Sequence, residues 1–294
     1  MRRFFAARFV GELGNQFSLY AIPLLVYLPS HNAARSGTAF AVEWLARLSG
    51  LALAGNVVDR FGSRAVYMLA ELLRSVSFLL AFVLVMSAPG SSYPVLLALG
   101  AVLGMSHEHF YIAGEALVGR VARRDVEHAQ GILGILDQLA LVAGPAVAAL
   151  VAGLASTMTL LAVVGALALC GAGLVFSLPL AEPPSAVHFG GAGGRHALRE
   201  MTVGFRAVSR SRALRVMVGL TMLSNLVLGV VLALGPALVT GVFRYPQQAY
   251  GLLGSVAGAV SALALVGGRL ARRRCSAIAV GLTALCGIFC ARSE

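Results

Sequence analysis

The chain has 294 residues, of which 59% are hydrophobic and only 12% charged, and its mean hydropathy is +0.85. Soluble domains carry about 25% charged residues, so this composition excludes an ordinary water-soluble core. The net charge is +11, but the arginines come in short clusters between apolar runs and form no continuous stripe. This arrangement argues against nucleic acid as a partner and indicates a lipid bilayer instead.

Apolar runs long enough to cross a membrane follow one another along the chain. A spanning helix needs about 20 mostly apolar residues, and the sequence predicts an all-α integral membrane protein of about nine spans. The candidates are 4–28, 38–58, 65–88, 93–117, 130–153, 156–179, 213–242, 248–270 and 276–291.

One long polar stretch, residues 180–212, separates six spans (1–179) from about three (213–294). It begins with a Pro-Pro pair and contains a glycine-rich run, which is typical of a linker. Leu198, Met201, Phe205 and Val208 then recur at helical spacing among arginines. We therefore expect a linker that ends in an amphipathic helix on the membrane surface.

Arginine positions predict the orientation, because basic residues stay on the cytoplasmic side. Alternate connections hold seventeen of the 23 arginines on one side and three on the other, and the remaining three fall within spans. The sequence therefore predicts a cytoplasmic N-terminus and a multi-pass protein of the cell's inner membrane.

The connection between the second and third spans has a distinctive pattern, Gly55-x-x-x-Asp59-Arg60-x-Gly62-x-Arg64. Gly62 permits a tight reversal, Asp59 is expected just before the third span, and Arg60 near the end of the second, where helix dipoles favour each charge. This pattern resembles the loop signature of the major facilitator superfamily. The resemblance implies a bundle of transmembrane helices and a charged cluster that gates it.

Two weaker matches point to the drug- and siderophore-export branch of that family. Gly144-Pro145 in the fifth span resembles its Gly-Pro signature, and GELGNQFSLYAIPLLVY in the first span is similar to its start. The family usually has twelve spans in two halves. On this resemblance residues 213–294 form an incomplete second half, and the chain is truncated at its C-terminus.

Six acidic residues lie within the predicted spans, where charge is costly and usually paired or functional. Three have an arginine three or four residues away on the same helical face, which favours self-neutralising pairs: Arg8 with Glu12, Glu43 with Arg47, and Glu71 with Arg74. The other three, Glu108, Glu115 and Asp137, have no arginine at helical spacing. We expect Glu115 to reach the cytoplasmic surface.

Glu108 and Asp137 are the candidates for carrying a proton or binding a cation, and the alternative is a polar contact that holds helices together. His107 and His109 flank Glu108, and histidine titrates near neutral pH. Residues two apart point about 200° apart on a helix, so the two histidines cannot both face Glu108. The same geometry argues against a metal site, and no cofactor is expected.

The sequence thus favours a secondary transporter that exports a small amphiphilic molecule by proton antiport and alternating access. The alternative is a truncated chain that does not transport, or a membrane-embedded subunit of a partner chain. No nucleophile–base or metal constellation suggests an enzyme.

Overall fold

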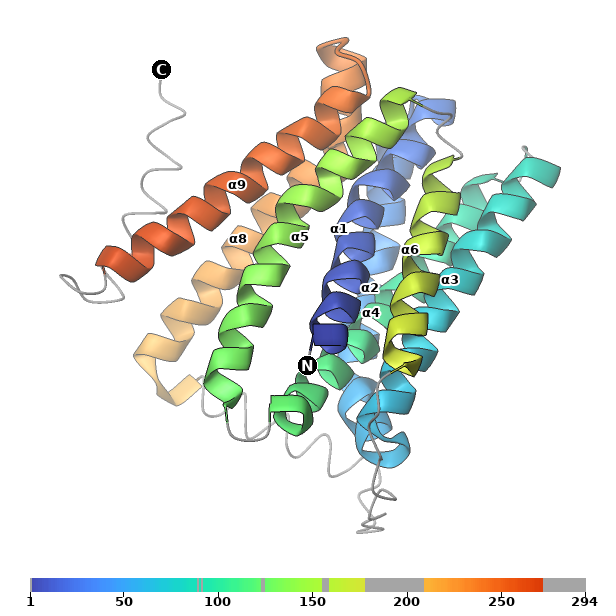
Figure 1. Cartoon of the computed structure of the whole chain (residues 1–294). Helices are drawn as coiled ribbons and strands as arrows, with labels where there is room; N and C mark the ends of the chain where they lie inside the picture. Colours follow the sequence, from blue (N-terminus) through green and yellow to red (C-terminus); the bar gives the residue numbers. More distant parts are fainter. Residues whose placement is uncertain are drawn as a thin grey trace.

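In the computed structural model, residues 2–88, 90, 92–122, 125–154, 159–177 and 209–271 are described. All regular secondary structure within these residues is helical (Figure 1). The α-helices are α1 (Arg2–Ser30), α2 (Ala33–Phe61), α3 (Ser63–Ser87), α4 (Ser92–Ala122), α5 (Val126–Leu154), α6 (Thr159–Phe176), α8 (Arg212–Pro236) and α9 (Gln248–Ala271). A π-helical turn, η2 (Ala237–Val242), extends α8.

Eight of the predicted spans coincide with these helices, and the seventh runs through α8 into η2. The ninth span, the linker up to residue 208 and the amphipathic helix from Leu198 to Val208 lie outside the described residues. Five segments among those described have the length and composition to cross a membrane, namely α3, α4, α5, α6 and Leu214–Val242. Both α1 and α2 have 29 residues, but each carries charged groups along its length.

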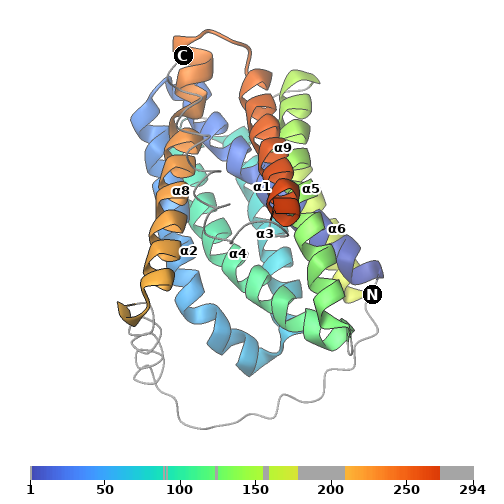
Figure 2. The same ribbon diagram turned by 90° about the vertical axis from the view of Figure 1, so that its left-hand side faces the viewer.

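The helices pack side by side around α1, which contacts α2, α5 and α6. On one side α2 packs against α4, and α3 fills the space between α4 and α6. Of the later helices, α8 lies against α2 and α9 lies along α5 (Figure 2). The exposed face of α3 is lined with large apolar side chains, such as Leu69, Val76 and Val83, as a surface in contact with lipid requires.

Glycines allow α2 and α4 to approach closely, as small residues do in membrane helix pairs. A Cβ atom on Gly50 would lie 2.9 Å from the Met105 backbone oxygen. A Cβ atom on Gly104 would clash with the backbone oxygen of Glu43. The small residues are therefore required where these two backbones cross.

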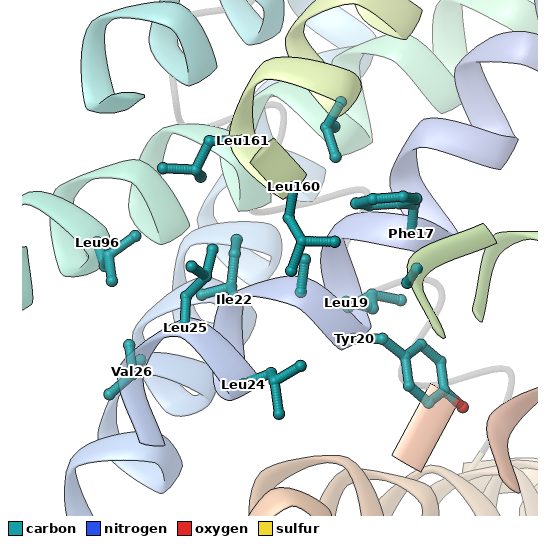
Figure 3. Packing of buried hydrophobic residues seen from close by; sticks show 14 of the residues in the cluster. Phe17, Leu19, Tyr20, Ile22, Leu24, Leu25, Val26, Leu96, Leu160 and Leu161 are labelled. Carbon is teal, nitrogen blue, oxygen red and sulfur yellow. The ribbon is translucent and has the colours of Figure 1, made fainter. Parts of the chain in front are cut away.

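Two separate apolar clusters form the core. The first contains Phe17 and Ile22 of α1, Leu96 of α4, and Leu160 and Leu161 of α6 (Figure 3). The second surrounds Phe4, Tyr67, Phe110, Leu117 and Leu133 near the other end of the bundle. Along α1, the charged residues Arg8 and Glu12 come between the two clusters. The bundle thus holds a charged layer between two apolar ones.

Candidate functional site

The charged layer contains three ion pairs, each formed within one helix. Their guanidinium and carboxylate groups lie 3.0 to 3.3 Å apart, and both partners are buried. The pairs are Arg8–Glu12 on α1, Arg47–Glu43 on α2 and Arg74–Glu71 on α3. The predicted same-helix pairing is therefore confirmed for all three.

Arg8 also gathers carboxylates from other helices. Its Nη2 lies 3.8 Å from Glu115 Oε1 of α4, and its Nε lies 3.7 Å from Asp137 Oδ1 of α5. The guanidinium also lies over the rings of Phe110 and Tyr111, 5.0 and 4.6 Å from their centroids. Arg8 is thus a cation shared by α1, α4 and α5.

This placement changes the interpretation of Glu115 and Asp137. Both do have an arginine, but it comes from another helix, which sequence spacing does not reveal. Gln130 of α5 donates a hydrogen bond of 2.8 Å to Glu115 Oε2, and Arg8 lies within 3.8 Å of its Oε1, so the partly exposed Glu115 has polar partners on two helices.

A second group of contacts joins α1, α2 and α4. Arg47 Nη2 donates to Asn15 Oδ1 at 3.0 Å, and Asn15 Nδ2 donates to Glu12 Oε2 at 3.4 Å. His107 Nδ1 lies 3.3 Å from Arg47 Nη1 and 3.2 Å from Glu108 Oε1. One ring nitrogen cannot accept from the arginine and donate to the carboxylate at once, so the position of a proton decides which contact forms.

The two histidines do face different ways. His107 lies in the charged layer, within 4.0 Å of Glu12. His109 is within hydrogen-bonding distance of the Met105 backbone oxygen, at 2.8 Å, and lines an apolar groove between α2, α3 and α4. Among the described residues, no group of three or more histidine, cysteine or acidic side chains is placed to hold a metal ion.

The acids of this connected network outnumber its arginines. Glu12 and Glu43 are buried beside Arg8 and Arg47, so these four charges balance. Three further acids have no arginine of their own, and their side chains are partly exposed: 17% for Glu108, 33% for Glu115 and 32% for Asp137. The acids that have no arginine of their own are therefore the more exposed members of the network.

The signature between the second and third spans is a sharp break rather than a loop. Gly62 alone separates α2 from α3, with φ 84° and ψ 144°, a conformation that favours glycine. Asp59 and Arg60 lie exposed in the last turn of α2. The expectation that Asp59 directly precedes α3 is therefore wrong, because α2 continues to Phe61. Arg64 donates to the Phe176 backbone oxygen at 2.7 Å, joining α3 to α6.

Gly144 and Pro145 lie inside α5, where the chain packs against two neighbours. A Cβ atom on Gly144 would lie 2.5 Å from Gln16 Cβ of α1. A Cβ atom on Gly251 of α9 would lie 2.6 Å from the Pro145 backbone oxygen. This part of α5 therefore joins the first six helices to α9.

Contacts between the two groups of helices concentrate at one end of the bundle. Ser36 Oγ donates to the Ala233 backbone oxygen at 3.2 Å, and Gln247 Nε2 donates to that of Ala152 at 2.6 Å. The rings of Tyr20 and Tyr250 lie 5.2 Å apart. This is the end that holds the connection between α8 and α9, at the top of Figure 2. At the other end of α8, Leu214 and Val216 are exposed.

Sequence reasoning missed Arg8 as the common partner of three acids, and it assigned no role to Asn15. The acids on α4 and α5 follow Arg8 by more than one hundred residues. The only local signal was an arginine placed within the first turns of a predicted span.

Comparisons with known proteins agree with this architecture. A search of curated protein sequences found no match. The crystal structure of the nucleoside transporter NupG superimposes with a TM-score of 0.72 at 13% identity, over 92% of this chain and 68% of that chain. The crystal structure of a D-xylose-proton symporter gives 0.63 at 16% identity, over 92% and 69%. At such low identities, these superpositions show a shared fold. Residues 4–292 also match the sequence model of the Major Facilitator Superfamily, and this multi-pass membrane protein therefore belongs to that family.

Proposed function

We propose that the chain is a secondary transporter that couples the movement of a small molecule to the movement of protons. The observation that carries this proposal is the charge imbalance of the network: Glu115 and Asp137 lie beside Arg8, which already pairs with the buried Glu12, and Glu108 lies beside His107.

An uncompensated carboxylate at membrane depth is costly, because little water is present to solvate it. The three acids therefore need positive charge from outside the network, either protons or a cationic substrate. Their side chains are partly exposed, and we propose that protons or substrate reach them from the space between the two groups of helices. Exchange of protons at Asp137 and Glu108, with His107 beside Glu108, is the chemistry that this arrangement favours.

Transport would proceed by alternating access, in which two helical bundles rock about a central site. The helix contacts at the α8–α9 end support this view, since within the part of the chain that the structure describes they join the two groups of helices at that end. With the N-terminus in the cytoplasm of a cell's inner membrane, as the arginine distribution predicts, the open end faces the cytoplasm. The exposed Asp59 and Arg60 beside Gly62 would then act as a gating element there.

For the direction, we propose export of a small amphiphilic molecule by proton antiport, on the strength of Gly144-Pro145 in α5. A second direction is favoured by one of the structural relatives, which is named as a D-xylose-proton symporter. A chain that works only with a partner is the further alternative.

The test is proton flux in liposomes that contain the purified protein and a pH-sensitive dye. Amphiphilic cations, nucleosides and sugars are added in turn, and the internal pH is recorded. We expect one class to drive proton flux, and Asp137→Asn to reduce that flux at least about tenfold, a loss of about 1.4 kcal/mol. Glu127→Gln is the control, because Glu127 lies exposed on the same helix.

The sign of the flux distinguishes the two directions. Protons that move opposite to the substrate indicate antiport, and protons that accompany it indicate symport. Full proton coupling in Asp137→Asn would refute the proposed role of Asp137. Protein that is correctly inserted but drives no flux with any compound would favour the partner-dependent alternative.

A further inference from the structure

Arg8 occupies an unusual position in the charged layer. Its side chain is 0% exposed, and it is surrounded by carboxylates from α1, α4 and α5 at 3.3, 3.8 and 3.7 Å. None of its three guanidinium nitrogens completes a hydrogen bond. Charge-assisted hydrogen bonds are usually 2.7 to 2.9 Å long, so these contacts are longer than the best that the same groups can make.

The site is shaped to keep the guanidinium there. A Cβ atom on Gly114 would lie 2.8 Å from Arg8 Nη1, so the absence of a side chain at that position leaves room for the arginine. The rings of Phe110 and Tyr111 both lie against the guanidinium. Arg8 can therefore shift toward one carboxylate or another only by small distances.

The helix that carries Asp137 connects two parts of the molecule. Its first half is linked to α4 by Arg8 and by the hydrogen bond from Gln130 to Glu115. Its second half packs directly against α9, where a Cβ atom on Gly258 would lie 2.7 Å from the Leu141 backbone oxygen. A change in how Arg8 holds α5 would therefore reach α9 through a continuous helix.

We infer that Arg8 is a positioning residue that transmits the protonation state of Asp137 to the arrangement of the helices; this inference rests on the proposed function. When Asp137 is ionised, Arg8 attracts it and holds the first half of α5 against α1 and α4. When Asp137 takes a proton from water onto a carboxylate oxygen, that attraction is lost, and Arg8 remains paired with Glu12 and Glu115. Of its two links to α4, the first half of α5 then keeps the hydrogen bond from Gln130 to Glu115, and the loss of the other lets it move toward α8 and close the open end.

Other titratable and charged groups surround Arg8 and Asp137, and each contributes to the electrostatic potential at these two residues. They are Glu12 on α1, Arg47 on α2, Tyr67, Glu71 and Arg74 on α3, and His107, Glu108, Tyr111 and Glu115 on α4. Among the acids near Arg8, Asp137 lies on α5, the helix that packs along α9, whereas α1, which carries Glu12, has a much smaller contact with α9.

The test measures a distance and needs no substrate. Spin labels are attached at Val126→Cys on α5 and Leu214→Cys on α8, both exposed positions near the open end. The four native cysteines are replaced by serine. We expect the distance between the labels to shorten when the pH falls from about 8 to about 5. Carboxyl groups in water have ordinary pKa values below this range, so they stay mostly ionised throughout it.

The variant Arg8→Gln/Glu12→Gln removes both charges of one buried pair and leaves the partly exposed Glu115 and Asp137 without their arginine. The matched control is Arg74→Gln/Glu71→Gln, since Arg74 is equally buried and also lies over Phe110, but forms no ion pair with α5. We expect the pH-dependent shortening to disappear in the first variant and to persist in the control. The variant Arg8→Lys, which keeps a positive charge at this position, should retain part of the pH-dependent shortening.

Three results would overturn the inference: no pH-dependent change in the parent protein, a change of opposite sign, or a change that survives in Arg8→Gln/Glu12→Gln. If the first variant does not fold, Gly114→Ala, which displaces the guanidinium, must reduce the change.

A distance change without proton-driven transport would refute the proposed function but not the role of Arg8. Proton-driven transport without a distance change would refute the role of Arg8 alone.

Discussion

Single residues differ in how well the sequence predicts their surroundings. Arg47 and Glu43 are four residues apart on one helix, so their contact follows from helical geometry. Arg8 and Asp137 meet only because α1 and α5 pack together. No periodicity within either segment contains that information, and the most connected residue of the network was therefore the least predictable.

The glycines of α4 give a prediction at the same scale. Gly104→Ala places a methyl group against the Glu43 backbone oxygen, and we expect it to destabilise the protein by about 1 to 3 kcal/mol through overpacking. Gly119→Ala has no neighbour within 4 Å and should stabilise α4 by about 0.4 to 1 kcal/mol. Unfolding in detergent micelles measures both. Equal stabilities would show that α2 and α4 do not cross so closely.

Helices were predicted better than single contacts, because a long apolar run has few alternatives in a membrane. The limits of α2 were less accurate. Its predicted end at residue 58 falls short of Phe61, since the charges of Asp59 and Arg60 were taken to mark a loop. One glycine is sufficient to reverse the chain, and the two charged residues remain helical.

The two signature glycines of this segment should respond differently to the same substitution. Gly62→Ala forces a side chain into a conformation that is nearly restricted to glycine, and we expect a cost of about 1 to 3 kcal/mol. Gly55→Ala replaces an exposed helical glycine with open space around it and should gain up to about 1 kcal/mol. Denaturant titrations of the two variants provide the comparison. A stable Gly62→Ala protein would contradict the sharp break.

At the scale of the whole molecule, a charged layer lies between two apolar clusters, and the helix groups meet at one end. The six acids and their arginines were visible in the sequence as separate exceptions to an apolar pattern. Their assembly into one layer depends on the relative depth of five helices, which no local pattern specifies. The layer is also what connects the fold to the proposed transport, because its acids outnumber its arginines and three of those acids are partly exposed.

The most direct test is to ask whether Asp137 exchanges a proton. Infrared difference spectroscopy of the protein in lipid, recorded as the pH is changed, detects the carbonyl stretch of protonated carboxyl groups. The account predicts a band that disappears as the pH rises, is reduced in Asp137→Asn and is unchanged in Glu127→Gln. A spectrum identical in all three proteins would mean that Asp137 does not exchange a proton, and the network would then be a structural feature of the bundle.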